Sequence, residues 1–228
     1  MWLNDFVSLV YPKVCTCCGN NLWKEEVVVC TLCEYHLPKT WYHLEHDNPV
    51  SRIFWGRVPV ESAAAFLHFN KGNRVQHLIH QLKYNGRTDI GTWLGSRYGN
   101  SLKQSHFFSS AEVIIPVPLH RKRQQARGFN QSELFASGLA SSMSLPVEKQ
   151  LLFRTGFTET QTRKSRYKRW ENVSGIFTLR DNTKLSGKHL LLVDDVITTG
   201  ATLEACVQAL RSIPGVRISI AAIASTRS

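Results

Sequence analysis

The chain is short of acidic residues and has no long apolar run. Its 228 residues include 17 Asp and Glu against 28 Lys and Arg, which leaves a formal net charge of +11. Such a balance favours polyanionic ligands, either pyrophosphate or nucleic acid. No apolar run reaches the ~20 residues of a membrane-spanning helix, so we expect no membrane insertion. No basic segment precedes Asp5, which argues against a secretory signal and for a cytoplasmic protein.

Two nucleotide-binding signatures are absent as well. The sequence contains neither G-x-x-x-x-G-K-[ST] nor G-x-G-x-x-G, which excludes a Walker P-loop and the Rossmann dinucleotide fingerprint. The stretch from residue 191 to 202 has a different pattern: an apolar strand, the acidic pair Asp194 and Asp195, and a Thr/Gly turn that leads into a helix. We expect this unit at the carboxyl edge of a parallel α/β sheet, where such folds bind ligands.

The acidic pair and the turn together suggest a ligand that carries both hydroxyls and a phosphate. Backbone N–H groups at a helix N-terminus bind anions, and Gly200 lets the backbone approach a ligand closely. Carboxylates repel a phosphate but accept hydrogen bonds from a diol. A ribose 5-phosphate therefore satisfies both halves. The alternative, an ordinary strand–turn–helix, leaves Asp194 and Asp195 without a partner at the end of a buried strand.

A second strand–loop–helix unit precedes this one. The apolar run 112–118 predicts a buried strand, and Asn130 with Glu133 has the spacing of a capping box at a helix start. We expect the connection between them to be an anion-binding loop, because it carries the cations Arg121, Lys122, Arg123 and Arg127. A solvated basic run is the alternative.

Other patterns complete the expected domain. Strands are predicted over 61–69, 148–152 and 216–224, and helices over 75–82 and 90–102. Lys83 and Arg87, at the end of the first of these helices, either face the ligand cleft or offset the helix dipole.

Five of the six cysteines lie between residues 15 and 33. Two C-x-x-C pairs supply four thiolates for a closed tetrahedral zinc site, formed by Cys15, Cys18, Cys30 and Cys33. A short strand over 27–29 fits a zinc-ribbon arrangement, and disulfides are the weaker interpretation without a secretion signal. Cys17 is either a bystander or an alternate ligand. Because four cysteines leave no open position, the metal would be structural. Residues 37–56 lack periodicity and are interpreted as a linker.

The segment 154–173 is polar, basic and long for a compact domain, which indicates a functional loop. Tyr167 and Trp170 stand among five cations in it. Such a loop closes over a substrate or stacks the bases of single-stranded nucleic acid. The cations are Arg163, Lys164, Arg166, Lys168 and Arg169.

These motifs, in this order, resemble the ComF family of competence proteins. The acidic pair with its turn resembles the phosphoribosyl pyrophosphate (PRPP) motif of type I phosphoribosyltransferases. The resemblance implies an α/β fold: a type I phosphoribosyltransferase-like parallel sheet flanked by helices, with a small N-terminal zinc ribbon. The implied domains are residues 1–50, with an N-terminal helix and the four-cysteine zinc ribbon, and residues 56–228, with the transferase fold.

The resemblance also implies a function. Asp194 and Asp195 would act as catalytic residues that contact the ribose hydroxyls, and the basic loop would hold pyrophosphate. The loop 154–173 matches the mobile loop that closes over the substrate. The implied activity is phosphoribosyl transfer from Mg²⁺-PRPP to an unknown acceptor, linked to DNA uptake by the competence machinery. The alternative is a non-catalytic PRPP-binding protein that handles single-stranded DNA. The 5-phosphate would be wrapped by Thr198, Thr199, Gly200, Ala201 and Thr202.

Overall fold

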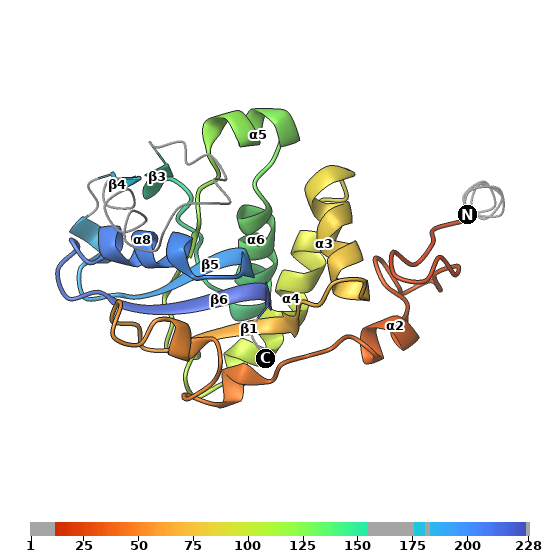
Figure 1. Cartoon of the computed structure of the whole chain (residues 1–228), viewed down its shortest axis with the longest axis horizontal. Helices are drawn as coiled ribbons and strands as arrows, with labels where there is room; N and C mark the ends of the chain where they lie inside the picture. The colour runs from red at the N-terminus through yellow and green to blue at the C-terminus, as the bar shows by residue number, and fades with distance from the viewer. Residues whose placement is uncertain (1–11, 155–175, 181–182, 227–228) are drawn as a thin grey trace.

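Four parallel strands form the central sheet, in the order β1-β6-β5-β2 (Figure 1). The computed structural model describes residues 12–154, 176–180 and 183–226. The sheet strands are β1 (Ala63–His68), β2 (Val113–Pro116), β5 (His189–Ile197) and β6 (Arg217–Ser225). A separate antiparallel pair consists of β3 (Leu152–Arg154) and β4 (Phe177–Leu179).

The helices connect and cover these strands. The α-helices are α2 (Thr31–Tyr35), α3 (Arg74–Tyr84), α4 (Asp89–Gln104), α5 (Arg121–Arg127), α6 (Gln131–Met143) and α8 (Ala201–Leu210). The 3-10 helices are η1 (Tyr42–Leu44), η2 (Ser51–Ile53) and η3 (Thr183–Leu185). The predicted strands 61–69, 112–118 and 216–224 and the predicted helices 75–82 and 90–102 are confirmed. Every helix in the described part of the chain is too short or too polar to cross a lipid bilayer.

Strand β5 lies inside the sheet because its apolar residues are continuous. Successive side chains of a strand point to opposite faces. Leu191 and Val193 belong to the core that includes α3, α4 and α6, whereas Leu190 and Leu192 pack in the core that includes α8. All four side chains are fully buried. A strand buried on both faces requires such a continuous apolar run, and this burial fixes where the acidic pair emerges.

Helices α4 and α6 approach so closely that only glycine fits between them. A Cβ added at Gly95 would collide with the carbonyl oxygen of Phe135, and one added at Gly138 would collide with that of Thr92. The contact sets the position of α6. Because Ser132 at the start of α6 touches the acidic pair, the contact also bears on the site.

The carboxyl ends of the central strands meet at one edge of the sheet. Pro116 of β2 pairs with Val193 of β5, so the segments that follow these two strands start side by side. The basic segment follows β2, and the Thr/Gly turn follows β5. This places the two predicted anion-binding segments at the same edge, as parallel α/β topology requires.

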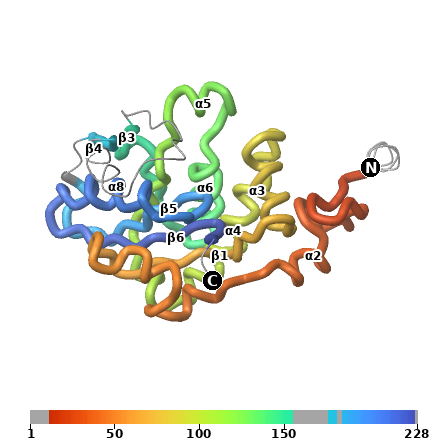
Figure 2. The backbone as a smooth tube through the Cα atoms, in the orientation of Figure 1, coloured from red at the N-terminus to blue at the C-terminus, as the bar shows by residue number. Residues whose placement is uncertain are grey.

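The interpretation of residues 37–56 as a linker is wrong. Lys39 forms an antiparallel bridge with Leu67 of β1, and Thr40 N donates to Phe66 O at 3.0 Å. The buried Asn48 side chain donates to Ala63 O at 3.0 Å. Figure 2 shows this segment, in orange, running along β1 from the N-terminal end of the molecule toward the opposite end. We call residues 37–58 the strap. The division into domains 1–50 and 56–228 stays a prediction.

Two predicted strands are also wrong. Residues 27–29 form bends, because Val28 and Val29 pack into the core without a partner strand. The strand predicted over 148–152 is replaced by a single bridge from Val147 to Ile114 and by β3, which begins at Leu152. A short apolar, β-branched run can form either a strand or a buried irregular segment, so the pattern alone does not distinguish the two. The predicted N-terminal helix lies outside the described residues.

Candidate active site and metal centre

The acidic pair emerges at the carboxyl end of β5. Asp194 Oδ1 accepts a hydrogen bond from Ser132 Oγ at 3.0 Å and another from the Asp195 backbone N–H at 2.9 Å. Burial, together with the charge of Asp195, raises the pKa of Asp194 to about 7. These two donors lower the pKa without offsetting burial. The carboxyl group is therefore held in a fixed orientation and is readily protonated.

Lys83 resolves one alternative left open by the sequence. Its Nζ lies 2.6 Å from Asp195 Oδ2, and both side chains are largely buried. Lys83 occupies the last turn of α3, so this helix delivers a cation to the acidic pair. Arg87 instead pairs with Asp89 at 2.8 Å. Of the two cations, Lys83 faces the site and Arg87 does not contact it.

The Thr/Gly turn forms a small hollow at the N-terminus of α8. The hollow has a volume of about 40 Å³ and is lined by Asp194 and the residues from Val196 to Leu203. Gly200, with φ of 75°, takes the left-handed conformation that favours glycine and starts the helix. Thr198 and Thr199 are exposed. The first N–H groups of a helix have no partner within it, so this hollow suits a phosphate. All five predicted turn residues, Thr198 to Thr202, line it.

The predicted basic loop is a short helix. His120 Nδ1 accepts from Lys122 N at 3.2 Å at the start of α5, and Gly128, with φ of 80°, ends it. Arg121 and Lys122 are exposed, and Arg123 is half-buried. The prediction of a loop was wrong because basic residues with Gln and Ala favour a helix once a cap is present.

Arg127 plays a different part from the other three cations of α5. Its guanidinium lies 5.3 Å from the centre of the Tyr84 ring and donates to Gln131 Oε1 at 3.0 Å. It therefore ties α5 to the end of α3 and the start of α6. Lys83, which contacts Asp195, and Tyr84, which contacts Arg127, are neighbours in α3. The end of α3 therefore contacts both the acidic pair and the basic helix.

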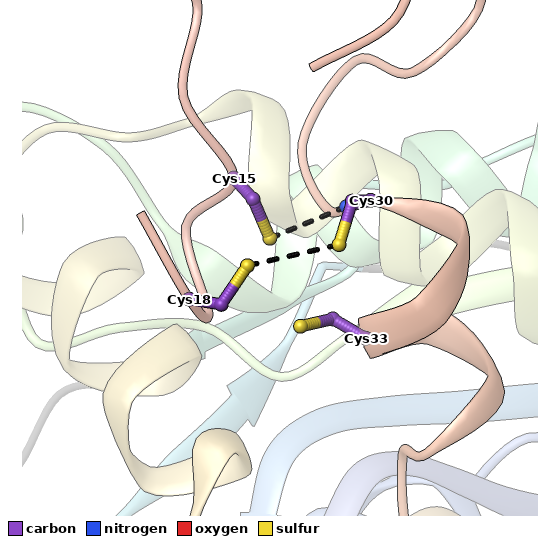
Figure 3. Close-up of side chains that lie close together, drawn as sticks. All are labelled: Cys15, Cys18, Cys30 and Cys33. Carbon is purple, nitrogen blue, oxygen red and sulfur yellow. Dashed lines mark hydrogen bonds between the residues drawn. The ribbon is translucent and has the colours of Figure 1, made fainter. Parts of the chain in front are cut away.

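The four paired cysteines come together near the N-terminal end of the described chain. Their sulfur atoms all lie within 4.8 Å of one another, and Cys18 Sγ is 3.7 Å from Cys30 Sγ (Figure 3). Four thiolates around zinc at ~2.3 Å stand about 3.8 Å apart. The donor set therefore fits a closed, structural zinc site held by Cys15, Cys18, Cys30 and Cys33.

Comparison with known proteins finds relatives along most of the chain and a matching family in its C-terminal part. The family described as "Phosphoribosyl transferase domain" matches residues 130–228. The "DNA utilization protein YhgH" of Escherichia coli K12 is 28% identical over 207 residues, which cover 90% of this chain and 86% of that protein. "Competence protein ComFC" of Bacillus subtilis is 26% identical over 208 residues, covering 89% and 79%. "Competence protein F" of Haemophilus influenzae is 36% identical over 112 residues, 49% of each. The chain is thus similar to competence proteins of the ComF type over most of its length.

Solved structures similar to this chain include a phosphoribosyltransferase and a PRPP amidotransferase. Adenine phosphoribosyltransferase of Saccharomyces cerevisiae is 14% identical, with a TM-score of 0.40, over 60% of this chain and 69% of that one. Glutamine PRPP amidotransferase of B. subtilis is 22% identical, with a TM-score of 0.39, over 62% and 30%. The fold of the chain is the expected one: a parallel sheet flanked by helices, with a cysteine cluster compatible with zinc near the N-terminus.

Cys17 lies outside the cluster of four cysteines. Its sulfur is not among the four that lie within 4.8 Å of one another, and burial raises the pKa of its thiol to about 12. Burial also raises the pKa of Cys15, but backbone N–H groups of Cys30, Cys18 and Cys17 outweigh it and lower the pKa to about 7. Of the two roles predicted for Cys17, the structure therefore favours that of a bystander over that of an alternate ligand.

Two residues that the fold brings to the site, Ser132 and Arg57, were not predicted, and Arg154 was predicted only as part of the loop 154–173. Ser132 holds Asp194. Arg57 donates to Thr199 O at 3.0 Å from the strap. Arg154, at the end of β3, lies within electrostatic reach of Arg123 and Asp194, and burial lowers its pKa. Each is far from its neighbour in sequence, so no local pattern could have indicated it. The predicted mobile-loop cations Arg163 to Arg169 lie outside the described residues.

Proposed function

We propose that this chain binds Mg²⁺-PRPP at the carboxyl edge of its sheet and transfers the phosphoribosyl group to an acceptor. The observation that carries the proposal is the arrangement of three features at one edge: the acidic pair, the hollow at the start of α8, and the basic helix α5. Together they match a ligand with a diol between two anionic groups.

The acidic pair and the hollow would bind the ribose 5-phosphate part of PRPP. The ribose hydroxyls donate to the carboxylates of Asp194 and Asp195, and the 5-phosphate accepts from the backbone N–H groups between Thr198 and Thr202. Lys83 neutralises Asp195, which lowers the cost of bringing an anionic ligand close to two acids. Asp194, held by Ser132, keeps its acceptor atom in place.

The basic helix would bind the pyrophosphate. Negative charge grows on this leaving group as its bond to the ribose breaks, and fixed cations stabilise that charge in the transition state. Arg121, Lys122 and Arg123 supply these cations, whereas Arg127 supports the helix through Tyr84 and Gln131. No protein nucleophile is needed, because the acceptor attacks the ribose carbon directly.

Magnesium would arrive with PRPP. Mg²⁺ takes oxygen ligands and is commonly bound through one or two carboxylates and the phosphates of the substrate, and the carboxylates of Asp194 and Asp195 offer such oxygens. When bound, it would neutralise part of the pyrophosphate charge. The protein residues would orient the ribose and exclude water from it.

Calorimetry with Mg²⁺-PRPP tests the proposal. The wild type is expected to bind, and the Asp194→Asn/Asp195→Asn variant is expected to lose at least tenfold in affinity, about 1.4 kcal/mol. Asp47→Asn, which removes an exposed acid of the strap, is the matched control and should bind like the wild type. Absence of binding by the wild type would overturn the proposal. Release of pyrophosphate with an added acceptor then tests for catalysis.

A second candidate function is the handling of single-stranded DNA by a chain that binds PRPP without turning it over. The net charge of +11 favours it, and relatives bear the names "DNA utilization protein" and "Competence protein". Charge reversal of Lys164, Lys168 and Arg169 should abolish DNA binding, measured by fluorescence anisotropy, and spare PRPP binding. If both activities survive, this candidate fails. A role in uptake of transforming DNA, and a cytoplasmic location, are part of the proposal.

A further inference from the structure

The strap forms one wall of the phosphate-binding turn. A Cβ added at Gly200 would lie 2.6 Å from Ile53 Cγ2 and 3.1 Å from Phe54 Cε1, so the strap presses directly on this glycine. Phe54 is fully buried, and the neighbouring Asn48 and Ser51 are buried and hydrogen-bonded. This part of the strap is therefore a fixed surface against which the turn is set.

Arg57, at the end of the strap, joins three segments with one guanidinium. Its Nη1 donates to Ile53 O at 3.1 Å within the strap and to Thr199 O at 3.0 Å in the turn. Its Nη2 forms an ion pair with the carboxylate of Glu204 in the first turn of α8. The planar guanidinium presents several donors in fixed directions, so Arg57 sets the turn relative to both the strap and the helix.

The charge of Arg57 matters as much as its geometry. Glu204 follows directly after Leu203, the last residue that lines the hollow, and its side chain is only 7% exposed. An unpaired carboxylate here would repel a phosphate bound at the helix N-terminus, because charges interact strongly where water is excluded. Arg57 neutralises this carboxylate through their ion pair. The carboxylate then repels a bound phosphate less.

We propose that Arg57 is a positioning residue for the 5-phosphate: it fixes the Thr198–Thr202 turn and neutralises Glu204 beside it. The inference rests on the proposed function, because it assigns a partner to the turn of that same site. It makes a specific prediction about ligands. Loss of Arg57 should weaken the binding of ligands that carry a 5-phosphate on ribose. The binding of inorganic pyrophosphate, which would bind at α5, should be unchanged.

Binding of ribose 5-phosphate and of Mg²⁺-pyrophosphate, each measured by calorimetry, tests this inference. Arg57→Ala should lose about tenfold or more in affinity for ribose 5-phosphate, with unchanged affinity for pyrophosphate. Arg57→Met/Glu204→Gln removes the contacts of Arg57 with Thr199 and Glu204 without leaving a buried charge. This double variant should lose less affinity for ribose 5-phosphate than Arg57→Ala does. Arg52→Ala is the matched control, since Arg52 lies in the same strap and its side chain pairs with the exposed Asp47.

The ligand comparison separates positioning from general destabilisation. Equal losses for both ligands in the variants, or no loss for either, would overturn the role of Arg57. The double variant carries the test if Arg57→Ala does not fold, because it leaves no unpaired acid. A wild type that binds neither ligand would overturn the proposed function, and this inference with it. A wild type that binds both, with unaltered variants, would overturn only the role of Arg57.

Discussion

At the scale of single residues, Asp194 is held in an arrangement that costs stability. Burial and the charge of Asp195 raise its pKa to about 7, whereas the usual value for Asp is ~3.9. Between these two pH values the folded chain binds more protons than the unfolded chain, so the free energy of unfolding falls as pH rises. Above pH 7 the full cost of ionising Asp194 is present. Residues kept at such a cost commonly serve binding or catalysis.

Replacing Asp194 by Asn should therefore stabilise the protein at high pH. The amide cannot ionise, and its oxygen can still accept from Ser132. We expect Asp194→Asn to raise Tm by roughly 2–6 °C at pH 8 and to leave it unchanged at pH 5, where the wild-type carboxyl is protonated. Thermal melts across this range measure the difference. The control is Asp195→Asn, which strands Lys83 and should lower Tm at pH 8. A Tm difference for Asp194→Asn that does not change with pH would contradict the raised pKa.

Local sequence patterns predicted some site residues and could not predict others. The acidic pair, the turn and the four cysteines are each contiguous or closely spaced, so their chemistry is visible in a few letters. Lys83, Arg57 and Ser132 reach the site from α3, the strap and α6. Their roles depend on how distant segments pack. For this reason the sequence did not decide whether Lys83 faces the ligand cleft or offsets the helix dipole, and Arg57 and Ser132 were not predicted at all.

At the scale of elements, the contact between α4 and α6 should be the most sensitive to added volume. Gly95 and Gly138 each face the backbone of the opposite helix, which cannot rotate away as a side chain can. Alanine normally stabilises a helix relative to glycine by ~1 kcal/mol. Here we expect Gly95→Ala and Gly138→Ala to destabilise by about 1–3 kcal/mol, because overpacking outweighs that gain. Urea denaturation measures the change.

Asn100→Ala supplies the control for the helix contact. Asn100 is exposed in α4, so alanine there changes helix propensity without changing the contact, and stability should hold or rise. If the glycine variants are as stable as Asn100→Ala, the two helices do not pack as closely as described. A displaced α6 would also move Ser132 away from Asp194, so the glycine variants should weaken Mg²⁺-PRPP binding together with stability.

Elements with a strong period were predictable, and those defined by tertiary contacts were not. Helix α3 shows apolar residues three and four apart, and β5 shows an unbroken apolar run, so both follow from elementary patterns. The strap has no period because it is held by individual tertiary contacts, such as the hydrogen bonds of Thr40 and Asn48 to β1 and the burial of Phe54. Helix α5 was missed because its cap, His120, is an uncommon capping residue.

At the scale of the whole molecule, the cysteine cluster and the sheet are parts of one structure. Cys15 and Cys33 belong to the same buried cluster as Leu78 and Leu94 of α3 and α4. Glu34 of α2 also pairs with Arg97 of α4 at 2.9 Å. Loss of a structural metal generally unfolds the segment that binds it. Here it should also expose part of the apolar surface of α3 and α4.

Zinc is therefore expected to stabilise more than the N-terminal segment. Purified protein should contain one zinc per chain by elemental analysis, and Cys33→Ser should lose it, whereas Cys17→Ser should keep it because Cys17 lies outside the cluster. We expect Cys33→Ser to lower the main Tm by about 2–8 °C, the effect of 1–2 kcal/mol in a chain of this size. Zinc loss with an unchanged main transition would show that the cluster folds independently of the sheet. Zinc loss from Cys17→Ser would instead make Cys17 a ligand and contradict the arrangement of the four sulfur atoms.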